Sequence, residues 1–394
     1  MPSSRLDGAA FTSVDWAAQD DRRRVRLRTV GFLVGVLALA ATFAFDYWLR
    51  SGALWGTYYP QRIDWLFGFG LLVFARFVVV PVAVDRESAR RYWRRVRGDP
   101  LAVLAVAYLG VVVVVALLAP EFRGIGRTDL TRQLQPPWLF SVPADAIERC
   151  VGSTAGGRCH GTLAHPFGTS GLGIDVLSWV VHGLREILMV ALSAAALMGV
   201  IATAVGATAG YYGGRVDDVL MRYVDVQQTV PTVVIYVFVA TLVLRDKGLV
   251  VLALFFGLLD WGGIARLVRS NVLKQRSEGY VRAARSAGAS DLHVLRTHLV
   301  PNASPAIATS LSRRVPMVVL TQVGLSFLVL SESNMRSIGE LLRRGLAARY
   351  VSGGWLAKWW VTVSAVVVVA LTVAALNVAG DAARDALDPR DGGA

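Results

Sequence analysis

The chain has 394 residues, 54% of them hydrophobic, and a formal net charge of +13, with a mean hydropathy of +0.50. The polar residues of a water-soluble protein could not cover that much apolar surface, so the composition favours a polytopic membrane protein. The positive charge does not indicate nucleic-acid binding, because the basic residues concentrate between apolar runs, as the positive-inside rule requires of cytoplasmic loops.

The first hundred residues predict a cytoplasmic N-terminus followed by two membrane helices. Arginines between positions 22 and 28 precede an apolar run that exceeds a signal peptide and lacks a cleavage site, which indicates an uncleaved anchor. We expect spans at residues 29–49 and 63–84, and then an arginine-rich cytoplasmic loop from Arg86 to Arg97. These two helices form a candidate N-terminal extension, and the sequence leaves open whether they bind lipid or a partner instead.

A third span at residues 101–119 is followed by a polar segment, residues 120–183, which counting spans places outside the cytoplasm. The segment contains both cysteines of the chain, Cys150 and Cys159, in a compartment where oxidising conditions permit a disulfide. Two free thiols are the alternative. A zinc site with His160 and His165 is a third interpretation, although the spacing fits no standard zinc finger.

Five further spans are predicted in the second half of the chain, at residues 184–211, 224–244 and 249–267, from beyond Asn302 to about residue 330, and at 361–378. Gly199, Gly206 and Gly210 permit close approach of neighbouring helices in the first of them. About eight spans in all place both termini and the Arg86–Arg97 loop on one side of the membrane.

Polar residues inside these spans are candidates for a translocation pathway. Pro231 frees backbone carbonyl groups that polar neighbours can satisfy, although a merely kinked helix is an equal alternative. A carboxylate within a span, such as Asp260, is a functional candidate by default, and structural pairing with Arg266 or Arg269 is the other interpretation. The candidate pathway residues are Gln227, Gln228, Pro231, Asp260 and Gln322.

A basic, helix-prone stretch, residues 278–302, separates the sixth and seventh predicted spans. Gly288 can end one short helix, since glycine adopts the left-handed conformation without strain. Ser290 and Asp291 can then cap a second helix that runs toward Pro301. A helix, a glycine corner and a second helix make a shape suited to docking onto a molecule outside the membrane.

This stretch resembles the EAA loop of ABC-importer permeases. Its end, His298-Leu299-Val300-Pro301-Asn302, looks like the variant of dipeptide and oligopeptide permeases, and Arg282 stands where the family has a glutamate. In that family the loop forms coupling helices that insert into a cleft on the ATPase subunit. The resemblance implies a coupling role for Tyr280, Arg282, Ala283, Ala284, Gly288, Ala289, Ser290, Leu295, His298, Pro301 and Asn302.

The segment from His165 to Ser178 resembles the family's HPLGTDxxGRDVLSR, which precedes the second core helix. Ser170 replaces the family's aspartate and Ile174 its arginine, so any salt bridge between those two family residues is absent. Residues 210–217 resemble AGYxGGxxD.

Further matches follow along the chain. Residues 261–269 resemble WPGYARLVR, and 325–328 resemble LSFLGLG, with Gln322 where a glutamate often stands. The proline-rich signature ending in SWG that follows in the family is missing. The tail, residues 377–390, resembles NxxGDxxRDxxDPR, so that the similarity covers roughly residues 101–391.

The resemblance implies an all-α polytopic fold with a six-helix permease core and two extra N-terminal helices. We expect the divisions to be residues 1–100 for the N-terminus and extra helices, 101–119 for the first core helix, 120–183 outside the cytoplasm, 184–380 for the core with its coupling loop, and 381–394 for a cytoplasmic tail. The chain would be a multi-pass protein of the cell membrane with both termini in the cytoplasm.

The implied function is that of a permease subunit, not an enzyme, which forms half of the pathway of an ATP-driven importer of di- or oligopeptides. A second permease, two ATP-binding subunits and an extracytoplasmic solute-binding protein are the implied partners. The chain has no GxxxxGK[ST] motif, so we expect no cofactor in it, with ATP and magnesium on the ATPases. No resident metal and no nucleic acid are expected.

Three alternatives remain. Family members also carry nickel complexes and other small solutes. An ion-coupled secondary transporter would use Asp260 or the carboxylates from Asp217 to Asp225, and would show internal repeats, which are not evident in this sequence. An intramembrane enzyme would need a His/Glu or Ser/Lys constellation within the spans, and no convincing one is present.

Overall fold

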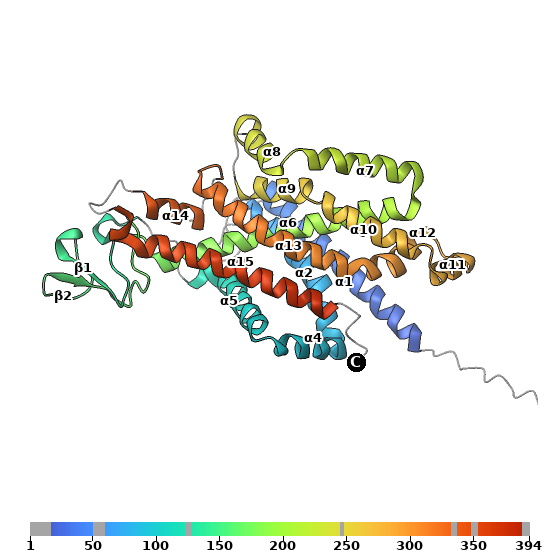
Figure 1. Ribbon diagram of the computed structural model, residues 1–394, viewed down its shortest axis with the longest axis horizontal. Helices are drawn as coiled ribbons and strands as arrows, with labels where there is room; N and C mark the ends of the chain where they lie inside the picture. Colours follow the sequence, from blue (N-terminus) through green and yellow to red (C-terminus); the bar gives the residue numbers. More distant parts are fainter. Residues whose placement is uncertain are drawn as a thin grey trace, which may run out of the picture.

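The computed structural model describes residues 17–49, 60–122, 128–244, 248–331, 337–347 and 354–387. Long helices lie side by side along the longest axis of the molecule (Figure 1). A small β-sheet region occupies one end of that axis, and two short helices, α11 and α12, occupy the opposite end (Figure 1). The chain is therefore an all-α membrane protein with a small sheet at one extremity.

The N-terminal part consists of α1 (Ala17–Leu49), α2 (Arg62–Phe74) with a π-helical turn (Ala75–Val79) and α3 (Val80–Val84), α4 (Arg86–Gly98) and α5 (Pro100–Phe122). The central part consists of α6 (Val176–Tyr212), α7 (Gly214–Thr229), α8 (Thr232–Phe238) with a π-helical turn (Val239–Leu244), α9 (Leu249–Leu259) and α10 (Gly262–Gln275). The last part consists of α11 (Gly279–Ser286), α12 (Asp291–Val294) with a π-helical turn (Leu295–Leu299), α13 (Val300–Phe327), α14 (Ile338–Leu346), a 3-10 turn (Gly354–Lys358) and α15 (Trp359–Leu387).

Within the described residues, six helical segments are long and apolar enough to cross a membrane, and a seventh is the pair α7 and α8, which bends by 69°. The polytopic all-α prediction is confirmed, but the count of eight spans is not. The helix expected as a further span is α13, and Arg313 and Arg314 near its centre lower its hydropathy. Its 28 residues are nevertheless long enough to cross a bilayer, and they pack beside α6, α10 and α15.

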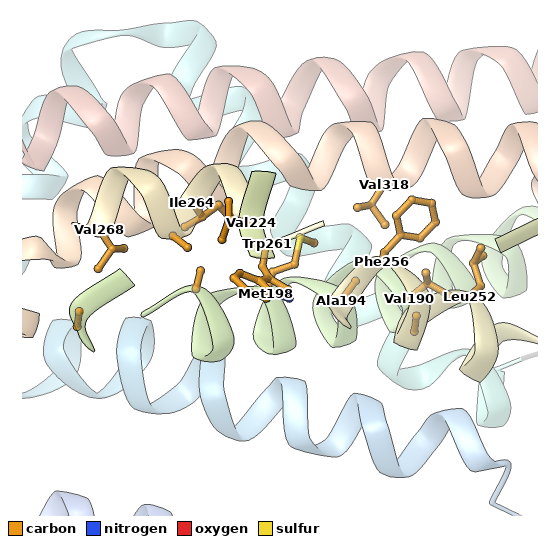
Figure 2. Packing of buried hydrophobic residues seen from close by; sticks show 14 of the residues in the cluster. Val190, Ala194, Met198, Val224, Leu252, Phe256, Trp261, Ile264, Val268 and Val318 are labelled. Carbon is orange, nitrogen blue, oxygen red and sulfur yellow. The ribbon is translucent and has the colours of Figure 1, made fainter. Parts of the chain in front are cut away.

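Helix α6 is the centre of the packing, with α2, α5, α9, α10 and α13 around it. In Figure 2, Val190, Ala194 and Met198 of α6 line one face of the helix opposite apolar residues of α9 and α10. A Cβ atom on Gly206 would lie 2.4 Å from the carbonyl oxygen of Ala265. The small residues of α6 therefore let α10 approach to backbone contact, as small residues do in membrane interiors.

The N-terminal extension is attached to this core through α2. Asp64 of α2 forms an ion pair with Arg185 of α6 at 2.9 Å, and both side chains are largely buried. A second nitrogen of Arg185 donates to the carbonyl oxygen of Ala116 in α5 at 3.2 Å. In contrast, none of the apolar window of α1 is buried within the chain. Helix α2 thus packs on α6, whereas the apolar surface of α1 stays open.

Residues 128–175 form the region at one end of the molecule. Its strands β1 (Ser141–Pro143), β2 (Thr154–Ala155) and β3 (Arg158–His160) make an antiparallel sheet in the order β1-β3-β2. A disulfide joins Cys150 to Cys159, whose Cα atoms are 5.7 Å apart. The region is held to the helices by the indole of Trp360, which donates to the carbonyl oxygen of Thr169 at 3.1 Å.

The two departures from the family segment lie in this region. Ser170 and Ile174 are each only 1% exposed, and the backbone N–H of Ser170 donates to the carbonyl oxygen of Ile174 at 2.9 Å. The side chain of Ile174 belongs to the apolar cluster around Trp179. A neutral, apolar replacement therefore fills the position where the family has an arginine.

Candidate functional site

The stretch 278–302, which we name the elbow, projects from the end of the molecule opposite the sheet (Figure 1). Helix α11 stops at Ser286, and Gly288 follows in the left-handed region with a φ of 82°. The hydroxyl of Ser290 then accepts a hydrogen bond from the backbone N–H of His293 and caps α12. Two helices meeting at a glycine corner are thus formed by local sequence signals.

The second helix of the elbow does not end at Pro301. It continues through the π-helical turn Leu295–Leu299 directly into α13, so that Pro301 lies in the first turn of α13. Proline is tolerated in the first turn of a helix, and a wider turn before it can satisfy the backbone groups that the ring leaves free. The elbow is therefore rigidly continuous with a helix of the membrane bundle.

The elbow has one face buried in the molecule and one face open. Val281, Val294 and Leu299 are fully buried and belong to the main apolar cluster. On the open side, the amide nitrogen of Asn302 donates to the hydroxyl of Tyr280 at 3.2 Å. Of the predicted coupling residues, apart from those at the glycine corner and cap already described, Tyr280, Arg282, Ala283, Pro301 and Asn302 are exposed, while Ala284, Ala289, Leu295 and His298 are partly buried.

A network of side chains fastens the elbow to the end of α6. The hydroxyl of Tyr211 donates to Oδ1 of Asp291 at 2.5 Å, and Nε of Arg285 donates to the same hydroxyl at 3.3 Å. The guanidinium of Arg285 also lies 4.7 Å from the centre of the Tyr211 ring. One tyrosine therefore contacts both arms of the elbow, α11 through Arg285 and α12 through Asp291.

This network borders an open cleft of about 450 Å³. Arg276 contributes to it from the end of α10 and donates to the carbonyl oxygens of Gly210 and Tyr211, at 3.2 and 3.3 Å. Tyr211 lies within the segment whose resemblance to AGYxGGxxD the sequence had revealed, but nothing in the sequence pointed to its contact with the elbow. The residues around the cleft are Tyr211, Tyr212, Arg276, Ser277, Arg285 and Asp291.

Three of the candidate pathway residues, Gln227, Gln228 and Pro231, lie at one helix break, whereas Gln322 lies in another helix, α13. Gln227 and Gln228 lie at the end of α7, where a Cβ atom on Gly262 would be 2.5 Å from Oε1 of Gln227. Pro231 follows immediately at the bend before α8. Gln322 is buried in α13 with 2% exposure, and its Oε1 has no hydrogen-bond partner among the described residues.

Asp260 lies at the break between α9 and α10, and its partner is Arg314 of α13, at 3.2 Å. The alternative interpretation, in which Asp260 pairs with Arg266 or Arg269, is therefore wrong. Those two arginines face α7 instead, where Arg266 pairs with Asp225 and Arg269 with Asp217. The reason is that residues 266 and 269 lie further along α10, beside the start and middle of α7, whereas Arg314 reaches the break itself.

Comparison with known proteins agrees with this architecture. A family described as the binding-protein-dependent transport system inner membrane component matches residues 202–391. The oligopeptide transport system permease protein of Haemophilus influenzae is 33% identical over 307 residues, which is 78% of this chain and 88% of that protein. The chain belongs to this family of binding-protein-dependent transport system inner membrane components. It is a multi-pass transport permease.

Other relatives extend the comparison. The dipeptide transport system permease protein of Bacillus subtilis is 31% identical over 301 residues, covering 76% of this permease and 84% of that protein. An oligopeptide transport system permease protein of the same organism is 28% identical over 301 residues, covering 75% and 88%. The matched family segment includes the elbow, the two helix breaks and α15, and it begins within α6.

Proposed function

We propose that this permease is one of two transmembrane subunits of an ATP-driven importer of di- or oligopeptides. The elbow carries the proposal, because it is a pair of short helices with an exposed polar face that projects from the end of a bundle of membrane helices. The names of the relatives, which are dipeptide and oligopeptide transport system permeases, support the choice of peptides. Two ATPase subunits, a second permease and an extracytoplasmic solute-binding protein are the proposed partners, with ATP and magnesium on the ATPases.

The proposed orientation places the elbow in the cytoplasm and the disulfide-bonded sheet outside. The two features lie at opposite ends of the molecule, which supports opposite sides of the membrane (Figure 1). The arginine-rich helix α4 and the end of α15 lie toward the elbow, as basic loops of the cytoplasmic side do (Figure 1). A disulfide also requires an oxidising compartment, which supports an extracytoplasmic sheet.

The elbow can transmit a movement of the ATPase subunits to the membrane helices. When two ATPase subunits close on ATP, the exposed face of the elbow would move with them. Its buried face and its continuity with α13 would carry that movement into the bundle, and Tyr211 would carry it into α6. Transport follows only where the peptide interacts differently with the two resulting states.

A long apolar face of α7, α8 and the π-helical turn that follows α8 is available to the second permease. Val219, Val226 and Leu242 are 64% to 68% exposed in the chain alone. Such a surface has to contact lipid or another membrane helix. We expect the second permease to cover part of it, since the pathway must be enclosed by two subunits.

The test is uptake by the complete importer, this permease with its second permease, ATPases and solute-binding protein, in proteoliposomes. Radiolabelled trialanine is supplied on the side of the binding protein and ATP on the side of the ATPases. Accumulation that requires hydrolysable ATP supports the proposal. Accumulation driven by an ion gradient without ATP would overturn it in favour of a secondary transporter, and uptake of nickel but not trialanine would overturn the choice of substrate.

A further inference from the structure

Two helix breaks meet inside the bundle. One separates α7 from α8 at Val230 and Pro231, and the other separates α9 from α10 at Asp260. The hydroxyl of Thr232, the first residue of α8, donates to the carbonyl oxygen of Leu259, the last residue of α9, at 3.3 Å. The polar backbone groups freed at both breaks therefore occupy one small region.

This region lies deep in the membrane. Asp260 is 11 residues into the span Leu249–Gln275, which corresponds to about 16 Å of helix. Arg314 is 14 residues into α13, or about 21 Å from its start. Charged side chains at such a depth face a water-filled path or another subunit, because contact with lipid is costly.

The ion pair between Asp260 and Arg314 is loose and incomplete. Both contacts use the same nitrogen of Arg314, NH1, at 3.2 Å to Oδ1 and 3.4 Å to Oδ2. A two-pronged guanidinium–carboxylate pair would use two nitrogens at about 2.8 Å. The side chains of Arg314 and Asp260 are 41% and 25% exposed. Arg314 thus has donors left over for a second carboxylate.

The surroundings of Arg314 also favour an anion. A Cβ atom on Gly263 would lie 3.3 Å from NH2 of Arg314, so the guanidinium lies at the N-terminus of the 14-residue helix α10. Helix N-termini present free N–H groups and a partial positive charge. Beside them, both polar atoms of the Gln227 amide are buried, and neither has a hydrogen-bond partner among the described residues. The two amides lie against the start of α10, since a Cβ atom on Gly262 would be 2.5 Å from Oε1 of Gln227 and 2.9 Å from Nε2 of Gln228.

We propose that Arg314, the N-terminus of α10 and the amides of Gln227 and Gln228 form a transit site for the C-terminal carboxylate of a peptide. This inference rests on the proposed function. Asp260 competes for the same guanidinium, so the peptide carboxylate is held weakly and released, as passage through a pathway requires. The site recognises an end that every unmodified peptide has, which suits a transporter of varied sequences.

The first experiment measures the charge preference of the site. The two native cysteines form the disulfide, so Gln228→Cys adds a single free thiol. The complete importer is treated with two methanethiosulfonates of similar size, one a sulfonate and one a trimethylammonium. In otherwise wild-type protein we expect the cysteine at position 228 to react faster with the sulfonate than with the trimethylammonium. Each rate is first divided by the rate at which the same reagent reacts with a free thiol in solution. Arg314→Gln removes the charge and its hydrogen bonds to the anionic reagent, and should lower the rate ratio about tenfold, or about 1.4 kcal/mol.

Two further variants make the result specific. Arg313→Gln removes the same charge from the adjacent, more exposed position, for which the described residues offer no ion pair, and should leave the ratio unchanged. Arg314→Lys keeps the cation and should retain most of the preference. The inference is overturned when neither reagent labels position 228, when Arg314→Gln leaves the ratio intact, or when Arg313→Gln lowers it equally.

The second experiment ties the site to peptides. Trialanine uptake is measured with saturating binding protein, together with ATP hydrolysis. We expect Arg314→Gln to lower uptake about tenfold while hydrolysis stimulated by the binding protein persists, and Arg313→Gln to have no effect. Undiminished uptake in Arg314→Gln would overturn the assignment to peptides. If the labelling shows the charge preference but the wild-type importer takes up no trialanine, the anion site stands and the proposed function is refuted.

Discussion

The hydroxyl of Tyr211 and Oδ1 of Asp291 are joined by a hydrogen bond of 2.5 Å, although 80 residues separate them in the chain. This bond connects the end of α6, the helix at the centre of the packing, to the first residue of α12 in the elbow. Arg285 completes the link from the other arm. A force on either arm of the elbow therefore reaches the same residue of α6.

Tyr211→Phe should uncouple the importer. The substitution keeps the ring and its contact with the Arg285 guanidinium, but it removes the hydroxyl's hydrogen bonds to Asp291 and from Arg285. A hydrogen bond to a charged group is typically worth about 1.5–3 kcal/mol. We expect fewer peptides imported per ATP hydrolysed, at unchanged assembly with the ATPases. Tyr212→Phe is the matched control, since its neighbouring ring is more than half exposed. Equal transport per ATP in the two variants would contradict the link.

Gly288→Val should also impair coupling, for a different reason. The position has open space around it but a φ of 82°, so the cost is backbone strain and not a clash. A β-branched residue in the left-handed region costs about 1–3 kcal/mol, which the elbow can relieve only by changing the angle between its helices. Gly279→Val, at an equally open position without a positive φ, should have little effect. Uptake and ATP hydrolysis measured side by side provide the check, and unaltered uptake in Gly288→Val would refute the coupling role.

The buried ion pair between Asp64 and Arg185 should hold the N-terminal extension to the core. Removing one partner of a buried ion pair typically costs about 3–5 kcal/mol, because the charge that remains has lost its counter-charge. Asp64→Leu should therefore lower the unfolding temperature of the purified permease markedly. The double variant Asp64→Leu with Arg185→Met should be less destabilised than that single variant, because no charge remains unpaired. Additive losses in the double variant would argue that the pair contributes nothing as a pair.

The disulfide should be accessible only from outside the cell, and only after reduction. A membrane-impermeant maleimide applied to cells is expected to label the permease when a reductant precedes it. Inside-out vesicles should give no labelling under the same conditions. Labelling from the cytoplasmic face alone would reverse the topology. Loss of the bond, by Cys150→Ser with Cys159→Ser, should cost about 2–3 kcal/mol of local stability, the value for closing a loop of this length.

Several features of this permease followed from the sequence by itself. Apolar runs of membrane length determined the all-α class, and local signals such as Gly288 and the cap at Ser290 determined the shape of the elbow. The motifs also placed the chain among ABC permeases before any contact was known. Such features depend on neighbouring residues, whose spacing the sequence states directly.

Only the tertiary structure shows which polar and charged side chains pair with one another. The sequence offered Arg266 and Arg269 as partners for Asp260, but the packing of α13 against α10 brings Arg314 to it instead. Tyr211 forms a hydrogen bond with Asp291, and Asp64 forms an ion pair with Arg185, although long stretches of chain separate the partners. Each pairing depends on which helices lie side by side and how each is rotated about its axis. That arrangement is the sum of many small packing contacts, and no local pattern in the sequence records it.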